Sequence, residues 1–193
     1  MPEPTREEAW ELVTEWVESD SLRKHLLGVE ACMVAYARER DEDEQLWAAT
    51  GLLHDLDYER YPDLETGHPR KALELFEEKG YPQELIDAVA GHATFLGVPR
   101  ETPMAKTLYA VDELSGFVAA CAYVRPTGIH GMKPKSVKKK LKQPSFAAAV
   151  NRDEVYGGAE ELGVDFDEHT AFVIAAMEER SGELGLDGEP EAA

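Results

Sequence analysis

Residues Trp47–Asp57 read WAATGLLHDLD, and this stretch decides the fold. It is almost entirely apolar up to Leu53, which is typical of a helix buried among other helices. His54 and Asp55 then interrupt the apolar run directly after two leucines. Neighbouring helix positions point about 100° apart, so one ion lying between these directions can take a ligand from each. We therefore expect a buried helix that ends in a polar, metal-binding pair.

Helical spacing of apolar residues recurs along the rest of the chain. The residues Ser19–Ser21 supply caps for a long helix, and Asp41–Glu44 supply a turn with an acidic helix start. Gly80 and Pro82 separate two further helices. No stretch alternates apolar and polar residues for long enough to require a sheet. The sequence predicts an all-α fold, with helices over 7–18, 22–36, 45–57, 67–79, 83–95, 103–124, 145–160 and 166–180.

A chain of 193 residues suits one domain with a full core. We expect a single domain over 1–180, with its metal-binding part at about 20–124 and a helical extension over 125–180. The segment 181–193 is rich in glycine and acidic residues and contains proline, so we expect it to be disordered.

The formal net charge of −19 argues against broad binding to nucleic acid or anionic lipid. No window approaches the roughly 20 apolar residues of a membrane span, and the acidic N-terminus does not resemble a targeting peptide. The two cysteines, Cys32 and Cys121, lie in apolar segments, which indicates buried free thiols. We expect a cytoplasmic protein that does not interact with membranes.

The segment 133–142 departs from this acidity, because it carries six lysines and no acidic residue. Two interpretations stay open at this point. The segment is either a site for a local anionic target or a solvated, self-repelling loop or helix.

Other polar residues also occupy apolar helical segments. Asp112 lies in the middle of 108–118, where an unpaired buried carboxylate would cost several kcal/mol. His25 lies between Leu22 and Leu26, and His68 and His92 lie at the ends of adjacent predicted helices. Each histidine alone is more typical of a hydrogen-bonded core residue, and Asp112 alone is typical of a buried ion-pair partner. Together with His54–Asp55 they favour a site for Mn, Fe, Co, Ni, Zn or Mg, because imidazole and carboxylate ligands without cysteine suit these metals.

The order His25 … His54–Asp55 … Asp112 resembles the H…HD…D signature of the HD superfamily of metal-dependent phosphohydrolases. GLLHDLD is similar to the central motif of that family, and the resemblance covers about residues 20–124. His68–Pro69 and Gly91–His92 resemble the additional histidines of the HDIG-type subgroup, some of whose members hold two metals. The resemblance implies a compact multi-helix bundle of the HD-domain type.

The resemblance also implies roles for individual residues. One divalent ion would be held by His25, His54, Asp55 and Asp112, and a second by His68 and His92 with Asp55 as the bridge. His54 and Asp55 would serve catalysis through the metal, and Asp57 or Glu59 would orient or deprotonate the attacking water. The resemblance implies a small phosphorylated substrate, and nucleotides are among the substrates considered. Candidates for binding it are the cations nearest the motifs and those of the lysine-rich segment: Lys24, Arg70, Lys71, Lys138 and Lys139.

Other activities fit the sequence less well. A cyclic-dinucleotide phosphodiesterase of the HD-GYP kind is disfavoured, because Ala93 follows His92 and Gly80–Pro82 precedes it. Phosphate-binding glycine loops and nucleophile elbows do not occur in the sequence. Two alternatives remain: a metal- or nucleotide-binding regulatory module without turnover, and a di-iron oxygenase-like member of the superfamily.

Overall fold

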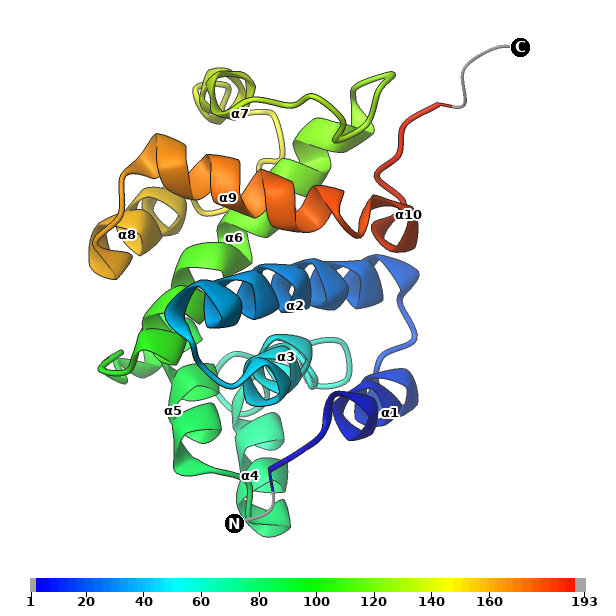
Figure 1. Ribbon diagram of the computed structural model, residues 1–193. Coiled ribbons are helices and arrows are strands. Elements are labelled where there is room, and N and C mark those ends of the chain that lie inside the picture. The colour runs from blue at the N-terminus through cyan, green and yellow to red at the C-terminus, as the bar shows by residue number, and fades with distance from the viewer. Residues whose placement is uncertain (1–2, 190–193) are drawn as a thin grey trace. The chain divides into compact units, whose positions relative to one another are not determined.

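The computed structural model describes residues 3–189, and these residues form helices and turns but no strand (Figure 1). The predicted all-α fold is therefore confirmed. In chain order the helices are α1 (Arg6–Trp16), α2 (Asp20–Arg40), α3 (Glu44–Leu53), α4 (Arg70–Lys79), α5 (Gln83–His92), the 3-10 helix η1 (Thr94–Leu96), α6 (Pro103–Tyr123), α7 (Pro134–Leu141), α8 (Arg152–Leu162), α9 (Phe166–Glu178) and α10 (Ser181–Leu184). The chain divides into two compact units, Met1–Tyr109 and Ala110–Ala193, and the division falls within α6.

The first unit is organised around α3, which packs against α1, α2 and α5. Figure 1 shows α2 lying along α3, with α4 and α5 side by side. Every residue of α3 from Leu46 to Leu53 is buried, as expected for a helix that is apolar on all sides. Gly51 allows α2 to approach closely, because a Cβ atom at this position would lie 2.9 Å from the Cα of Glu30. The central helix of the motif is therefore the packing centre of this unit.

Side-chain caps fix the helix starts that position the motif. Thr5 and Glu8 form a reciprocal capping box at the start of α1. Ser19 caps α2 by accepting from the Leu22 backbone, and Asp43 caps α3 by accepting from the backbone N–H groups of Gln45 and Leu46. The predicted cap at 19–21 and the predicted acidic start at 41–44 are both confirmed.

The second unit is organised around α9, which packs against α7, α8 and α10. His169 on α9 is buried, and its Nε2 lies 3.0 Å from the carbonyl oxygen of Ala110. Burial lowers the pKa of His169, because the charged imidazolium loses its hydration. This histidine is thus a hydrogen-bonded core residue of the second unit.

The helix predicted over 145–160 begins later, at Arg152, and 144–149 form turns. Ala147 has a left-handed backbone with φ of 43°, which a helix cannot accommodate. The guanidinium of Arg152 donates to the carbonyl oxygens of Ala147 and Val150 and thereby satisfies the turn. Asn151 then caps α8. The predicted start of this helix was wrong because these hydrogen bonds from the Arg152 side chain favour the turns.

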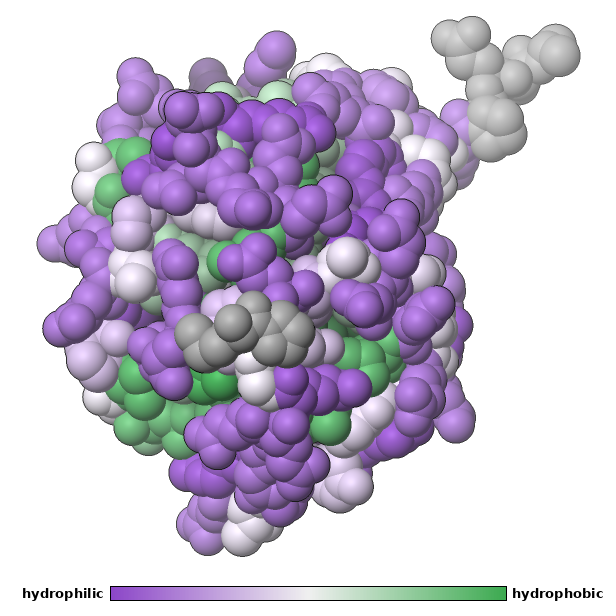
Figure 2. All heavy atoms as spheres, turned by 60° about the horizontal axis from the view of Figure 1, so that its bottom comes forward, coloured by the Kyte–Doolittle hydropathy of each residue, from purple (hydrophilic) through white to green (hydrophobic). Residues whose placement is uncertain are grey.

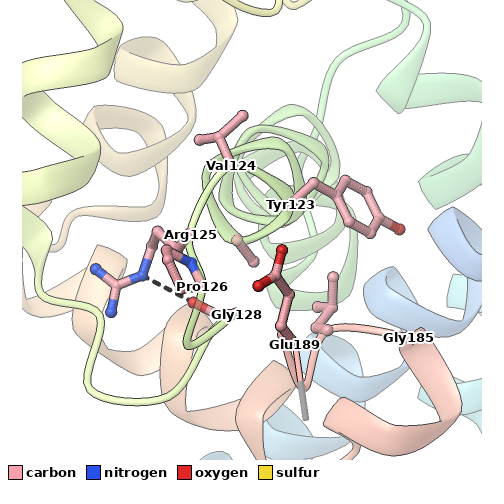
Figure 3. Close-up of a pocket in the computed structure, with 10 residues that line it drawn as sticks. Tyr123, Val124, Arg125, Pro126, Gly128, Gly185 and Glu189 are labelled. Atoms are coloured by element: carbon pink, nitrogen blue, oxygen red, sulfur yellow. Dashed lines mark hydrogen bonds between the residues drawn. The ribbon is translucent and has the colours of Figure 1, made fainter. Parts of the chain in front are cut away.

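The prediction of a disordered tail from Ser181 was wrong for the residues that the structure describes, 181–189. Ser181–Leu184 form α10, and Leu186 is buried. Backbone hydrogen bonds link Ile129 N–H to the Leu186 oxygen and Glu189 N–H to the Pro126 oxygen. Figure 3 shows Gly185 and Glu189 facing the 122–128 segment across a pocket of the second unit. Residues 190–193 of the predicted tail lie outside the described residues.

Hydrophilic side chains predominate on the face shown in Figure 2, in keeping with the net charge of −19. Within residues 3–189, no helix combines the length and the apolar composition that a membrane span needs. Cys32 and Cys121 are buried free thiols, as predicted. Burial raises the pKa of Cys121 to about 11, so this thiol is held in its protonated form.

Candidate metal centre

His54 and Asp55 lie at the end of α3, where the apolar helix gives way to turns. His54 is the C-cap residue and has no exposed surface, and Asp55 keeps 15% of its side chain exposed. The carboxylate of Asp55 is thus at the boundary between the core and solvent. This position allows an ion to be held by protein ligands while water or a substrate reaches it.

Four histidine side chains surround the carboxylate of Asp55. On one side, its Oδ2 lies 3.9 Å from His25 Nε2 and 3.6 Å from His54 Nε2. On the other side, its Oδ1 lies 3.4 Å from His68 Nε2 and 3.3 Å from His92 Nε2. Two potential metal-binding groups result, which share Asp55. We name them the first cluster (His25, His54, Asp55) and the second cluster (Asp55, His68, His92).

Hydrogen bonds at Nδ1 orient three of these imidazoles. His54 Nδ1 lies 2.8 Å from the Gly51 oxygen, and His92 Nδ1 lies 2.5 Å from the Val89 oxygen. His68 Nδ1 lies 2.8 Å from Oδ1 of Asp57. Carbonyl and carboxylate oxygens only accept, so each Nδ1 must carry a proton, and in the neutral ring each Nε2 then keeps its lone pair. The three lone pairs therefore face the Asp55 carboxylate.

The separations fit a shared metal ion. Two ligands that each lie about 2.1 Å from one metal are roughly 3.0–3.5 Å apart at tetrahedral or octahedral angles. The four nitrogen–oxygen separations, 3.3–3.9 Å, lie at or just above this range. Unprotonated imidazoles and a carboxylate without thiolate suit the borderline and hard divalent metals. The donor set thus fits one ion in each cluster.

Local backbone structure brings His68 to the centre. His68 precedes α4, so the predicted helix over 67–79 begins three residues late, at Arg70. The His68 N–H donates to the Tyr61 oxygen, which turns the loop back toward α3. Gly67 permits this turn, because a Cβ atom there would lie 2.3 Å from the Tyr61 oxygen. The ring of His68 consequently lies 5.2 Å from that of Tyr58 and 5.3 Å from that of His92.

Asp57 has contacts that differ from those expected of a residue that activates water. Its side chain has no exposed surface, and both of its carboxylate oxygens accept hydrogen bonds, from His68 Nδ1 and from the Ala72 backbone. Glu59, the other residue considered for this task, accepts from the backbone N–H groups of Glu18 and Ser19. Both acids therefore already accept hydrogen bonds from the protein, which the sequence did not indicate, and their role toward the attacking water stays a prediction.

Asp112 lies on α6 in the second unit, and neither cluster of the first unit includes it. Its backbone oxygen accepts a hydrogen bond from the Ser115 hydroxyl. The role of Asp112 as a metal ligand stays a prediction from the signature.

Three of the cations considered for substrate binding already contact other groups of the protein. Lys24 pairs with Asp20 at 2.7 Å and Lys71 with Glu74 at 2.7 Å. Arg70 donates to the Leu64 oxygen. Recruiting any of them to a phosphate would mean exchanging an existing contact. Their role in substrate binding stays a prediction.

The lysine-rich segment forms the helix α7, which packs on α9 and buries Val137 and Leu141. Lys138 pairs with Asp167 at 2.6 Å, whereas Lys139 is exposed. The segment is thus a folded amphipathic helix rather than a solvated loop, and its role in substrate binding stays a prediction.

These observations define the class of protein. It is an all-α protein whose first unit places four histidines around one aspartate, and this group of side chains could hold a divalent metal ion. Residues 22–116 match the family model described as HD domain. This segment belongs to the HD-domain family, whose members typically bind divalent metals. Comparison with curated proteins and with solved structures found no match.

Proposed function

We propose that the protein is a metal-dependent phosphohydrolase that acts on a small phosphorylated substrate by means of metal-activated water. The observation that carries this proposal is the position of Asp55, which presents one carboxylate oxygen to each pair of histidines. A carboxylate placed in this way can bridge two ions. The membership of residues 22–116 in the HD-domain family supports the same activity.

A bound divalent metal would lower the pKa of its water toward about 7 and polarise the phosphoryl group. The residues of the chain supply the setting for this chemistry. His54 and His92 keep their Nε2 lone pairs toward Asp55, because their Nδ1 atoms donate to backbone oxygens. The negative charge of Asp55 offsets part of the metal charge, and the remaining positive charge attracts an anionic substrate.

The partial exposure of the centre supports turnover. His25 keeps 23% and Asp55 keeps 15% of the side chain exposed, whereas His54, His68 and His92 are buried. Solvent and substrate therefore reach the centre from the side of His25 and Asp55. The exposed ring of Tyr58 lies 5.2 Å from the buried ring of His68.

The test is a metal assay combined with an activity assay. We expect the purified protein to bind divalent metal and to release phosphate from nucleotides or a generic phosphate ester when Mn, Co, Ni or Mg is added. Asp55→Ala should lose the bound metal and the activity, and His54→Ala should lose the ion of the first cluster and the activity. His130→Ala provides a control, because this histidine belongs to neither cluster. Wild-type metal content and activity in both cluster variants would refute the proposal.

The same preparation separates the two alternatives. A regulatory module would bind metal and a nucleotide without releasing phosphate. A di-iron oxygenase would contain iron, show a visible absorption band and consume oxygen with its substrate. Either result would replace phosphohydrolysis as the function.

A further inference from the structure

The side chain of Asp57 connects the second cluster to the helix behind it. This carboxylate has no exposed surface and lies two residues after Asp55. Its Oδ1 lies 2.8 Å from His68 Nδ1, and its Oδ2 lies 2.8 Å from the backbone nitrogen of Ala72. Ala72 is in the first turn of α4, where backbone N–H groups have no partner within the helix. Asp57 thus binds two donors at once, one of them on a histidine that faces Asp55.

We propose that Asp57 is a positioning residue, which holds His68 in the tautomer that can bind metal. This inference rests on the proposed function, because it assigns a role within the second cluster. The carboxylate accepts the Nδ1 proton of His68, so the lone pair of that imidazole is on Nε2, 3.4 Å from Oδ1 of Asp55. Asp57 acts through His68 and does not touch the substrate.

The hydrogen bond from the Ala72 backbone fixes which end of the side chain at position 57 faces His68. A backbone N–H is always a donor, so the group that faces Ala72 must be an acceptor. In an Asp57→Asn variant the amide oxygen is therefore held by Ala72, and the amide NH₂ faces His68 Nδ1. His68 must then accept at Nδ1 and carry its proton on Nε2, the atom that faces Asp55. This substitution, which barely changes the shape of the side chain, should reverse the tautomer of His68.

Nitrogen NMR of the imidazole rings reads the tautomer directly. We expect the neutral imidazole of His68 in the metal-free wild-type protein to carry its proton on Nδ1. In Asp57→Asn the proton should move to Nε2. A His68→Gln variant assigns the signals. A wild-type His68 that is protonated on Nε2 would overturn the proposal, and this measurement requires no variant of Asp57 to fold.

A metal titration of the same variant adds a second, independent readout. Mutation of such outer carboxylates typically weakens metal binding by about 10–100-fold. We expect a loss of this size for the ion of the second cluster, with the ion of the first cluster bound as in the wild type. Glu59→Gln is the matched control. It removes a carboxylate two residues from Asp57 that accepts hydrogen bonds from the backbone N–H groups of Glu18 and Ser19. Equal weakening of both ions, or none, would overturn the proposal.

The two failures are distinguishable. If the protein binds metal in both clusters but releases no phosphate, the proposed function fails and the role of Asp57 stands. If phosphate is released while the tautomer of His68 is unchanged in Asp57→Asn, the role of Asp57 fails and the proposed function stands.

Discussion

The Nε2 of His92 lies 3.3 Å from Oδ1 of Asp55, although α5 and the end of α3 are separated by the whole of α4 in the sequence. The opposite oxygen of the same carboxylate faces His25 and His54. One carboxylate therefore connects two groups of histidines. The protein should therefore bind two ions per chain, one on each side of Asp55.

Single ligand substitutions should remove ions in a defined pattern. His25→Ala changes only the first cluster and His92→Ala only the second, so each should reduce the bound metal by one ion per chain. Asp55→Ala changes both clusters and should reduce it by two. Elemental analysis after dialysis measures the stoichiometry. The same metal content in His92→Ala as in the wild type would mean that the second cluster does not bind an ion.

The close approach of α2 and α3 should make Gly51 sensitive to any side chain. A Cβ atom at this position would lie 2.9 Å from the Glu30 Cα, which belongs to a rigid helix backbone. We expect Gly51→Ala to lower the free energy of unfolding by about 1–3 kcal/mol, a cost typical of overpacking. Denaturant unfolding measures this change.

Gly91→Ala is the matched control for Gly51. Its Cβ atom would also meet a neighbour at 2.9 Å, but that atom is the Cγ of the Arg100 side chain, and a side-chain atom shifts more easily than a helix backbone. The loss of stability should therefore be smaller at Gly91. Equal losses at both glycines would show that backbone contact between α2 and α3 is not the reason.

The second unit should show a pH-dependent contact at His130. Its Nδ1 lies 3.1 Å from Glu178 and its Nε2 lies 3.2 Å from Asp187, so both ring nitrogens donate only when the imidazole is charged. The hydrogen bonds that His130 donates to Glu178 and, with the next largest effect, to Asp187 raise the pKa of His130 above its usual value of 6.5. Bonds from Ser181 and then His130 lower the pKa of Asp187.

The sign of the effect follows from linkage. Because the folded-state pKa of His130 is raised, its stabilising contribution is complete below about pH 6.5 and is lost as the pH rises through the raised value. Thermal unfolding of the wild type and of His130→Gln should therefore differ most at acidic pH and converge at alkaline pH. A difference that is independent of pH would exclude the charged contact. Acidification far enough to protonate Asp187 should also remove the difference.

Two lysines of α7 should differ in their effect, because Lys138 forms an ion pair within the protein and Lys139 is exposed to solvent. Lys138 pairs with Asp167, so Lys138→Gln should lower stability slightly, by about 0–1 kcal/mol. Lys139 is exposed, so Lys139→Gln should leave stability unchanged. If α7 attracts the anionic substrate, Lys139→Gln should raise KM at low salt, and the difference should disappear at high salt. An unchanged KM at low salt would leave α7 a solvated helix.

The helices were largely predictable because their signals are local. Caps at Ser19 and Asp43, and apolar residues at helical spacing, are read within a few positions of each other. Prediction was wrong where side-chain hydrogen bonds or nonlocal backbone contacts control the backbone. The turns before α8 depend on the Arg152 guanidinium, and the folded C-terminal segment depends on backbone bonds to 126–129.

Sequence by itself determined that a buried helix ends in His54–Asp55, and that three further histidines in apolar helical segments accompany this pair. Periodicity and composition suffice for this, since an apolar helix must be buried and the imidazoles within it need partners. Only the tertiary structure decided that His68 and His92 share the Oδ1 side of Asp55, and that Asp57 accepts the Nδ1 proton of His68. Such distances depend on how the loop over 58–68 closes and on which helices pack together. No local pattern encodes them, because the residues that meet are far apart along the chain.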